Sequence, residues 1–322
     1  MLATCTLLLM LAPTRAEPTA PTPHFGRGDE MVYTGEVAEE STRVDLTNRR
    51  RFGLEVRIFV LETTDAFTDL AVLTLLQSKE DPNVAPAAAA VTGVDPAKNR
   101  TPPAVRLEMV RVDANGRTTL LVPKPMPPIT LTAATETKAI PPVSLDSPTT
   151  LELGFLVPLP EKRPTLKAAW TISEMDRPDL TWAVAQSAVS NGAEVLELAG
   201  RQQTAKWENP SGLDKNWRRT DSVWVGTGDG LARQFTRTTE TKEGLHVIEK
   251  RTVRCVLSSP PSPNRGEGYN AIRKEIDAAV SFAADLDAGR ATRLSDRLDD
   301  FERRHRETPY RAALEAVRRR AK

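Results

Sequence analysis

The stretch Phe52-Gly-Leu-Glu-Val-Arg-Ile-Phe-Val-Leu61 decides the fold class. Its apolar residues occupy alternate positions: Leu54, Val56, Ile58 and Val60. Glu55 and Arg57 stand between them. Successive side chains of a strand point to opposite faces, so this order places one face on a core and the other in water. The stretch therefore predicts a strand of an antiparallel sheet.

Similar stretches recur through the first half of the chain, at 31–37, 69–76, 104–113 and 117–122. The stretch 69–76 is apolar on both faces, as in a central strand, with a short buried helix as the alternative. In 104–113 we expect Val105, Leu107 and Met109 to face the core, and Val112 to join them only after a slip in register. The turn Asp113-Ala-Asn-Gly116 predicts a hairpin, because Asn-Gly readily adopts positive φ.

The second half repeats this pattern at 151–157, 166–172, 180–185, 194–198, 221–225, 231–237 and 245–257. Gly226-Thr-Gly-Asp-Gly230 predicts a tight hairpin turn. Short strands at regular spacing predict an antiparallel curved sheet, a sandwich or a half-barrel over 30–258. Proline blocks central-strand pairing, so the proline-rich stretch 123–128 divides this region into halves at 30–122 and 150–258.

The period changes near the C-terminus. A proline-rich linker is expected at 259–268. Apolar residues then follow the spacing of a helical face: Tyr269, Ile272, Ile276, Ala279, Ala283 and Leu286. Gly289 fits a helix stop, and Thr308-Pro309 fits an N-cap followed by the first helical position. We predict a helical hairpin or three-helix tail at 269–322.

The N-terminus predicts export. Residues 2–12 are apolar and a small residue follows at Ala16, as in a secretory signal peptide at 1–16 with a flexible leader at 17–29. Export places the protein in the periplasm or outside the cell, with no transmembrane segment after cleavage. Lipidation of Cys5 is an alternative reading. Cleavage leaves Cys255 as the single cysteine, which we expect to be buried in a strand.

Charge and motifs exclude several kinds of chemistry. The chain has 44 Lys+Arg and 43 Asp+Glu, which argues against a nucleic-acid partner. Its three histidines form no zinc motif, and the glycine-rich turn lacks dinucleotide-binding spacing. We therefore assign no metal, no cofactor and no catalytic residue. His246 with Ser222 or Ser258 leaves a hydrolase with an unrecognised site as an alternative.

Tryptophan gives the one lead toward a ligand. All five tryptophans lie in the second half: Trp170, Trp182, Trp207, Trp217 and Trp224. Indole rings on a sheet face line apolar cavities as well as packing in cores. We take Trp182, Trp207 and Trp224 as candidate ligand-binding residues.

Two segments carry a resemblance to known proteins. They are Gly28-Asp-Glu-Met-Val-Tyr-Thr-Gly-Glu36, and the pattern from Val157-Pro-Leu-Pro160 through Trp170 and Gly192 to Asp221-Ser-Val-Trp-Val-Gly-Thr-Gly-Asp-Gly-Leu231. Over 28–257 the chain resembles uncharacterised exported β-rich proteins of Planctomycetes-type bacteria. More distantly, it resembles half-barrel carriers of the lipoprotein-localisation type. The second resemblance implies a concave sheet that shelters an apolar ligand.

Together these observations predict an exported bacterial envelope protein that acts as a non-catalytic binding or scaffolding module. Its partner is an envelope protein or a small apolar ligand. Two alternatives stay open: a carrier of lipid or another small apolar ligand, and the hydrolase. An apolar concave surface around Trp182 or Trp224 favours binding, whereas polar groups converging on His246 favour catalysis.

Overall fold

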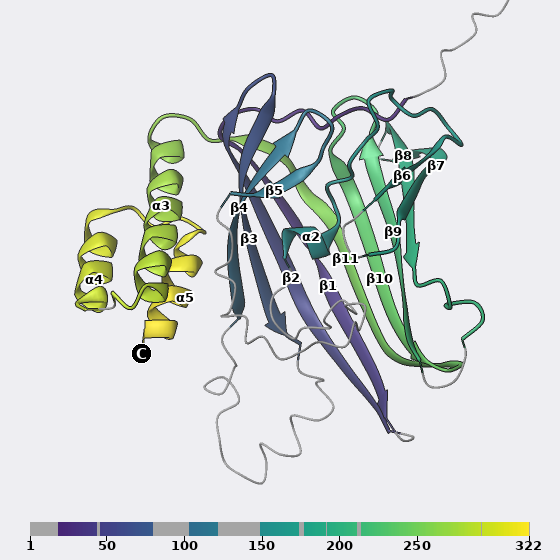
Figure 1. The fold of residues 1–322 in the computed structure, drawn as a ribbon. Helices are drawn as coiled ribbons and strands as arrows, with labels where there is room; N and C mark the ends of the chain where they lie inside the picture. The colour runs from purple at the N-terminus through teal and green to yellow at the C-terminus, as the bar shows by residue number, and fades with distance from the viewer. Residues whose placement is uncertain are drawn as a thin grey trace, which may run out of the picture.

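The computed structural model describes residues 19–43, 46–79, 103–121, 149–173, 177–190, 192–210, 214–290 and 292–321. These residues form a curved, unclosed antiparallel sheet followed by three C-terminal helices (Figure 1). The predicted fold class, a mainly β protein with a curved antiparallel sheet and a three-helix tail, is confirmed. The predicted signal peptide, Cys5 and the stretch 123–128 lie outside the described residues.

Within the described residues the sheet contains eleven strands. In chain order they are β1 (Asp29–Arg43), β2 (Leu46–Thr63), β3 (Phe67–Ser78), β4 (Ala104–Asp113), β5 (Thr118–Leu120), β6 (Ala169–Ile172), β7 (Leu180–Ser190), β8 (Ala193–Gln203), β9 (Lys215–Gly226), β10 (Ala232–Glu243) and β11 (His246–Pro263). Their order across the sheet is β5-β4-β3-β2-β1-β11-β10-β9-β8-β7-β6. The strands therefore form one continuous sheet and not a two-sheet sandwich.

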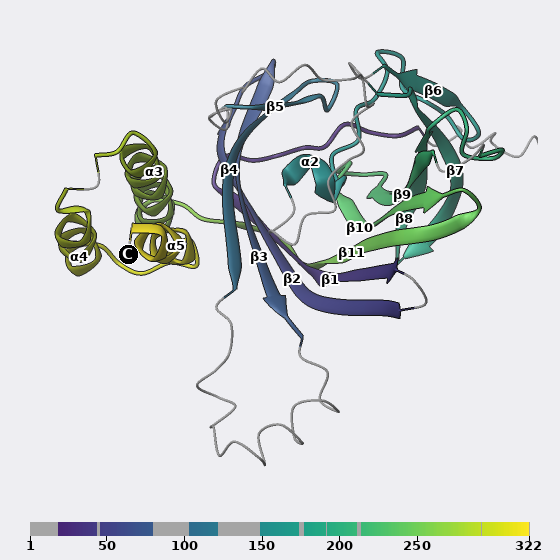
Figure 2. The same cartoon turned by 60° about the horizontal axis from the view of Figure 1, so that its bottom comes forward.

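The chain builds this sheet from two parts. Strands β1–β5 form the first half-sheet and β6–β11 the second, and they join where β1 pairs antiparallel with β11. Figure 2 shows the sheet curving around the short helix α2 (Thr150–Leu153) on its concave side. The two expected halves of the β region thus share a single sheet.

Two predicted hairpins are confirmed. Between β4 and β5 the amide of Gly116 donates to the carbonyl of Asp113 at 2.9 Å. Between β9 and β10 the amide of Gly226 donates to the carbonyl of Leu231 at 3.0 Å. Both turns connect adjacent antiparallel strands, as the glycine-containing sequences predict.

The concave face of the sheet carries the main hydrophobic core. The four apolar residues that alternate along β2 face it, and each is at most 3% exposed: Leu54, Val56, Ile58 and Val60. Cys255 of β11 lies in the same core and is 0% exposed, which confirms its predicted burial. Burial raises the pKa of the Cys255 thiol to about 12. The thiol therefore stays protonated at neutral pH and is a poor nucleophile.

The helices α3 (Glu267–Asp287), α4 (Leu294–Arg304) and α5 (Arg311–Ala321) cover the convex face of the first half-sheet (Figures 1 and 2). Phe59 and Leu73 point to this side, at 0% exposure each. This cover explains why 69–76 is apolar on both faces. Arg57, which was expected in water, is 22% exposed and pairs with Glu55 and Glu30.

Strand β4 corrects one expectation. Val105, Leu107 and Met109 pack with the helical cluster and not with the concave core. Val110 and Val112 face the concave core instead, at 0% and 3% exposure. No slip in register is needed, because both faces of this strand are covered.

A buried carboxylate fastens the helices to one another. Glu275 of α3 is 0% exposed and accepts hydrogen bonds from the amide and hydroxyl of Thr308. Arg311 of α5 donates to the same carboxylate at 2.7 Å. The Tyr269 hydroxyl donates to the carbonyl of Leu61 at 2.8 Å and so ties α3 to β2.

Three boundaries differ from expectation. The stretch 151–157 was expected as a strand, but Thr149 and Glu152 form a capping box that starts α2. The expected linker at 259–268 begins later, because β11 continues to Pro263. There β11 has passed the end of its pairing with β10, and register shifts against β1 accommodate the prolines.

The expected flexible leader also differs. From Thr19 onward the chain crosses one end of the sheet (Figure 1). Ala20 is 0% exposed, the His24 amide donates to the Asp229 carbonyl, and the Thr63 hydroxyl donates to the Phe25 carbonyl. The described part of the leader is therefore bound to both half-sheets.

Candidate functional site

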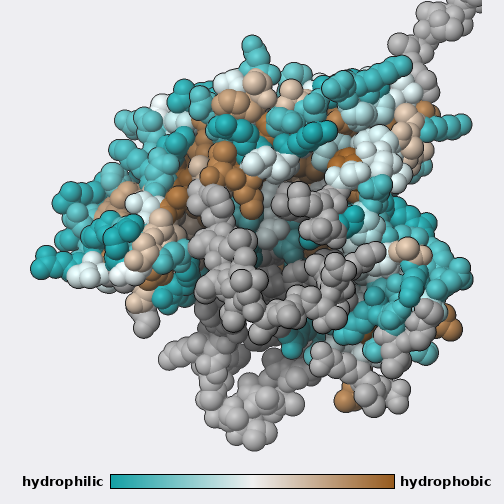
Figure 3. Space-filling view, viewed as in Figure 1, coloured by the Kyte–Doolittle hydropathy of each residue, from teal (hydrophilic) through white to brown (hydrophobic). Residues whose placement is uncertain are grey.

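A cavity of about 880 Å³ lies on the concave side of the second half-sheet, beside α2. Part of its wall is apolar, formed by Leu156, Ile172, Leu180, Trp182, Trp217 and Val253. The rest is polar and contains five arginines: Arg117, Arg177, Arg219, Arg237 and Arg251. Figure 3 shows further apolar side chains at the surface over β4 and β5, while the outer helices are mainly hydrophilic.

The strand register arranges the apolar and polar residues of the cavity wall in rows that run across the strands. The middle row runs across β1, β11, β10, β9, β8 and β7 through Val37, Val253, Arg237, Asp221, Gly200 and Trp182. The charged row lies two residues further along, through Glu39, Arg251, Thr239, Arg219 and Gln202. On its other side, the middle row borders an apolar row containing Cys255, Phe235, Val223 and Leu198. The concave face thus changes from apolar to charged along the strands.

Asp221 holds two of the arginines. Arg237 donates to both carboxylate oxygens of Asp221, from Nε at 2.6 Å and from Nη2 at 2.9 Å. Arg219 donates to the same carboxylate at 2.9 Å. The Asp221 side chain is 1% exposed, so this pairing compensates a charge that burial would otherwise make costly.

Arg237 also fixes α2 over the sheet. Its Nη1 donates to the carbonyl of Glu152 at 2.9 Å. Gly154 ends α2 with φ 77°, and a Cβ at this position would lie 2.2 Å from Nη2 of Arg237. Glycine is therefore required here by both backbone conformation and contact. On the opposite side, Thr150 donates to Glu108 of β4, so α2 connects the two half-sheets.

Arg251 and Glu39 are neighbours in the charged row. Both are buried, with 7% of the Arg251 side chain and 8% of the Glu39 side chain exposed, and Nε lies 3.4 Å from Oε1. Desolvation by burial raises the pKa of Glu39, although Arg251 and Arg50 act in the opposite direction. Glu39 and Arg251 thus form a buried ion pair in which Nε donates no hydrogen bond to Oε1.

The three candidate tryptophans occupy different places. Trp182 lines the cavity, is 1% exposed, and stacks on Trp170 with ring centroids 6.4 Å apart. A Cβ at Gly200 would lie 2.9 Å from the Trp182 ring, so the missing side chain makes room for the indole. Trp207 lies beyond β8 beneath Arg218 and Lys242, away from the cavity wall.

Trp224 lies on β9 but on the other face. Trp217 and Arg219 line the cavity, and Trp224 stands at an odd offset from both. Because side chains alternate along a strand, Trp224 belongs to the convex face. Trp217 contributes the second indole of the cavity and was not among the sequence candidates.

The alternative catalytic group is not assembled in the described residues. His246 is exposed and pairs with Glu243 at the start of β11. The Ser222 hydroxyl donates to Glu197, and the Ser258 hydroxyl donates to the carbonyl of Val32. Ser222 lies opposite Thr236, seven positions from Glu243 along β10, or roughly 23 Å at 3.3 Å per residue.

Two features are absent from the described part of the chain. No three His, Cys, Asp or Glu side chains there gather into a set suited to a metal ion. No helix there is both long enough and apolar enough to cross a membrane.

The charged side chains at the cavity were not predicted, although the sequence contains a pattern that indicates them. Arg237 stands two residues after Phe235, Arg251 two before Val253, and Asp221 two before Val223. Each charged residue thus holds a core-facing position in an alternating strand. Charges at inward positions of three strands are an unusual pattern, since buried charges require partners or a ligand.

These features define an open, curved antiparallel sheet that carries helices on its convex face and a partly charged cavity on its concave face. No family model matches the chain, and no curated protein matches it. The comparisons give no support to the likeness to Planctomycetes-type proteins.

Three solved structures are distant structural neighbours. One concerns lipid–protein interactions in lipovitellin, with TM-score 0.38 and 9% identity, covering 76% of this chain and 26% of the lipovitellin chain. The second is a DUF1329 family protein from Desulfovibrio piger, with TM-score 0.19 and 6% identity, covering 74% and 87%. The third is a putative outer membrane lipoprotein-sorting protein domain from Vibrio parahaemolyticus, with TM-score 0.16 and 9% identity, covering 74% and 88%.

Proposed function

We propose that this protein is a non-catalytic binding protein of the bacterial envelope that holds a small apolar ligand on the concave face of its sheet. The observation that carries the proposal is the cavity of about 880 Å³ with Trp182 and Trp217 in its wall. Small-molecule sites are concave and combine apolar surface with fixed polar groups, and this cavity is concave, has an apolar part to its wall and holds Arg237 in a fixed position.

The surroundings of the cavity support a preformed site. Its floor is a hydrogen-bonded sheet, and Arg237 and Thr150 hold α2 beside it. Residues supported by rigid elements keep a binding geometry better than residues on loops do. In this proposal 30–258 is the binding part, and 269–322 supports its convex face.

The location in the envelope rests on the sequence. The apolar residues 2–12 and Ala16 fit a signal peptide, which directs a protein out of the cytoplasm. A scaffolding role would use the outer surface and an envelope protein as partner. The cavity favours a small ligand over that role, because a scaffold needs no enclosed space.

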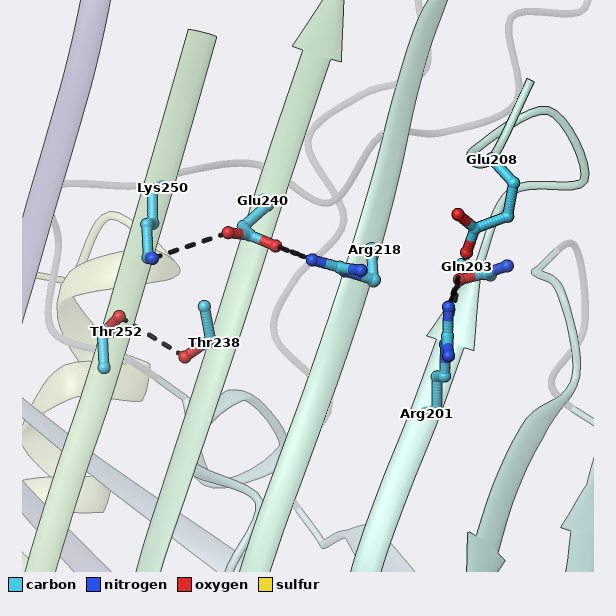
Figure 4. A network of polar contacts seen from close by, with 8 residues as sticks. All are labelled: Arg201, Gln203, Glu208, Arg218, Thr238, Glu240, Lys250 and Thr252. Carbon is cyan, nitrogen blue, oxygen red and sulfur yellow. Dashed lines mark hydrogen bonds and ion pairs between the residues drawn. The ribbon is translucent and has the colours of Figure 1, made fainter. Parts of the chain in front are cut away.

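A neutral fluorescent probe tests the proposal. We expect N-phenyl-naphthylamine to bind the purified protein with a rise in fluorescence. Thr239→Trp places an indole inside the cavity and is expected to abolish this rise. The matched control is Thr238→Trp, which adds the same side chain to the convex face of the same strand (Figure 4).

The two variants make the result specific. Equal probe binding by wild type and Thr239→Trp would contradict the cavity as the binding site. Absence of probe binding by the folded wild type would contradict an apolar ligand. Circular dichroism of each variant establishes that the sheet is intact.

A further inference from the structure

Arg251 lies in the wall of the cavity with donors that no described residue uses. The side chain is 7% exposed, and Nε and Nη2 have no hydrogen-bond partner within the described residues. Glu39 lies 3.4 Å from Nε and Glu152 lies 3.8 Å from Nη1, so both carboxylates are near without accepting from the unused donors. Buried guanidinium groups normally have their donors satisfied.

Arg237 lies one row away from Arg251 and differs from it in the use of its donors. Its three nitrogens all donate: Nε and Nη2 to Asp221, and Nη1 to the Glu152 carbonyl. Arg219 takes part in the same pairing with Asp221. The chain has thus provided a dedicated counter-ion for two arginines of the cavity. Arg251 has Glu39 and the more distant Glu152 nearby, and neither carboxylate accepts a hydrogen bond from its Nε or Nη2.

The charged residues of the described cavity wall are mainly arginines. Five arginines line the cavity, and Asp221 pairs with two of them, Arg237 and Arg219, while Glu152 is the one carboxylate residue among the described lining. In the charged row Arg251 is followed by the hydroxyl of Thr239 and then by Arg219. These side chains form a donor-rich strip across the cavity wall, and Trp217 lies in the row beyond it. Val253 and Trp182 lie in the middle row, next to the charged row, with Arg237, Asp221 and Gly200 between them.

We propose that the ligand of this cavity is an amphiphile with an anionic oxygen group, a carboxylate or a phosphate, which binds Arg251 while its apolar chain lies along Val253 and Trp182. This inference rests on the proposed function and names the class of ligand. The planar guanidinium matches such groups because it offers two parallel donors to two oxygens. Val253, Trp182 and the other apolar side chains of the cavity wall give the hydrocarbon part a surface to cover.

Matched ligands test the inference by isothermal titration calorimetry. Dodecanoate and dodecanol share one chain and differ in the anionic group, while acetate and inorganic phosphate supply the anion without the chain. We expect wild type to bind dodecanoate about tenfold or more tightly than dodecanol. Acetate and phosphate are expected to bind far more weakly than dodecanoate.

Variants of β11 test whether Arg251 causes the preference for dodecanoate over dodecanol. Arg251→Gln is expected to bind dodecanoate and dodecanol equally, and Arg251→Lys to regain part of the preference. Arg254→Gln is the control, since Arg254 is exposed on the convex face of β11. If Arg251→Gln does not fold, the wild-type comparison of dodecanoate with dodecanol still decides the matter.

The possible failures are distinguishable. Equal binding of dodecanoate and dodecanol by wild type overturns the anionic ligand but leaves a neutral apolar ligand in place. Binding of phosphate or acetate as tight as that of dodecanoate overturns the amphiphile in favour of a free anion. Absence of binding by both dodecanoate and dodecanol, together with absence of binding by N-phenyl-naphthylamine, overturns the proposed function as well.

Discussion

The two half-sheets share one backbone architecture but differ in what covers their convex faces. In the first half-sheet the helices lie on that face, and β3 is buried over most of its length. In the second, buried residues on β10 alternate with partly exposed ones over much of the strand. The apolar content of a strand therefore depends on how many of its faces are covered, and not on its position in the sheet.

The convex face of the second half-sheet is built from polar pairs. Arg218 and Lys250 pair with Glu240 across three strands, and Arg201 bonds Gln203 and Glu208 (Figure 4). Such cross-strand pairs suit a face in water. The concave side of the second half-sheet also carries the charged row, which runs from β1 across β11, β10, β9 and β8.

The largest expected effect concerns the helix-covered face. Phe59 is 0% exposed, with its ring centroid 5.5 Å from that of Tyr269 and 6.0 Å from that of Tyr310. Phe59→Ala removes the side chain that joins β2 to two helical segments. We expect the free energy of unfolding to fall by about 3–5 kcal/mol, measured by urea denaturation. A loss below about 1 kcal/mol would mean that the helices do not depend on this contact.

A smaller, pH-dependent effect is expected at the junction of the half-sheets. Burial raises the pKa of Glu39 above its usual value of 4.5, so the folded protein holds this proton more firmly than the unfolded chain does. The stabilising contribution of Glu39 is therefore complete below pH 4.5 and is lost as the pH rises through the folded pKa.

Glu39→Gln tests this contribution by urea denaturation at a series of pH values. As the pH rises above 4.5, the free energy of unfolding of the variant is expected to increase relative to that of wild type. This difference then levels off at higher pH. Glu40→Gln is the control, because the Glu40 side chain is 45% exposed on the convex face. A variant that loses stability relative to wild type as the pH rises would contradict the assignment.

The smallest effect is expected on the uncovered convex face. The Arg201 side chain is 54% exposed and that of Glu208 is 61% exposed, so water screens their ion pair. Arg201→Ala is expected to change the free energy of unfolding by about 0.5 kcal/mol or less, again measured in urea. A loss comparable to that of Phe59→Ala would remove the distinction between the two convex faces.

Much of the fold follows from local patterns. Alternation in β2, the Asn-Gly turn before β5 and the helical spacing from Tyr269 onward each reflect interactions between residues close in sequence. The face to which a strand residue points depends on what packs there, so Val105, Leu107 and Met109 were assigned to the wrong core. Likewise, the pattern of 151–157 favoured a strand, whereas the capping box of Thr149 and Glu152 starts a short helix there.

The site was harder to predict because it is assembled across strands. Trp182 could be proposed from composition alone, whereas Trp217 was not singled out from the other indoles. The grouping of Arg251, Arg219 and Thr239 depends on the register of three strands. Register arises from long-range pairing, and a single sequence does not state it.

The pairing of β1 with β11 has a consequence for the order of folding. The hydroxyl of Ser258 donates to the carbonyl of Val32, a contact between residues 226 positions apart in the chain. The central ladder of the sheet therefore cannot form until nearly the whole β region has been synthesised. Contacts of such high sequence separation slow folding, because a long loop must close before its ends interact favourably. The β1–β11 ladder is therefore expected to form late in folding, after the hairpins within each half-sheet.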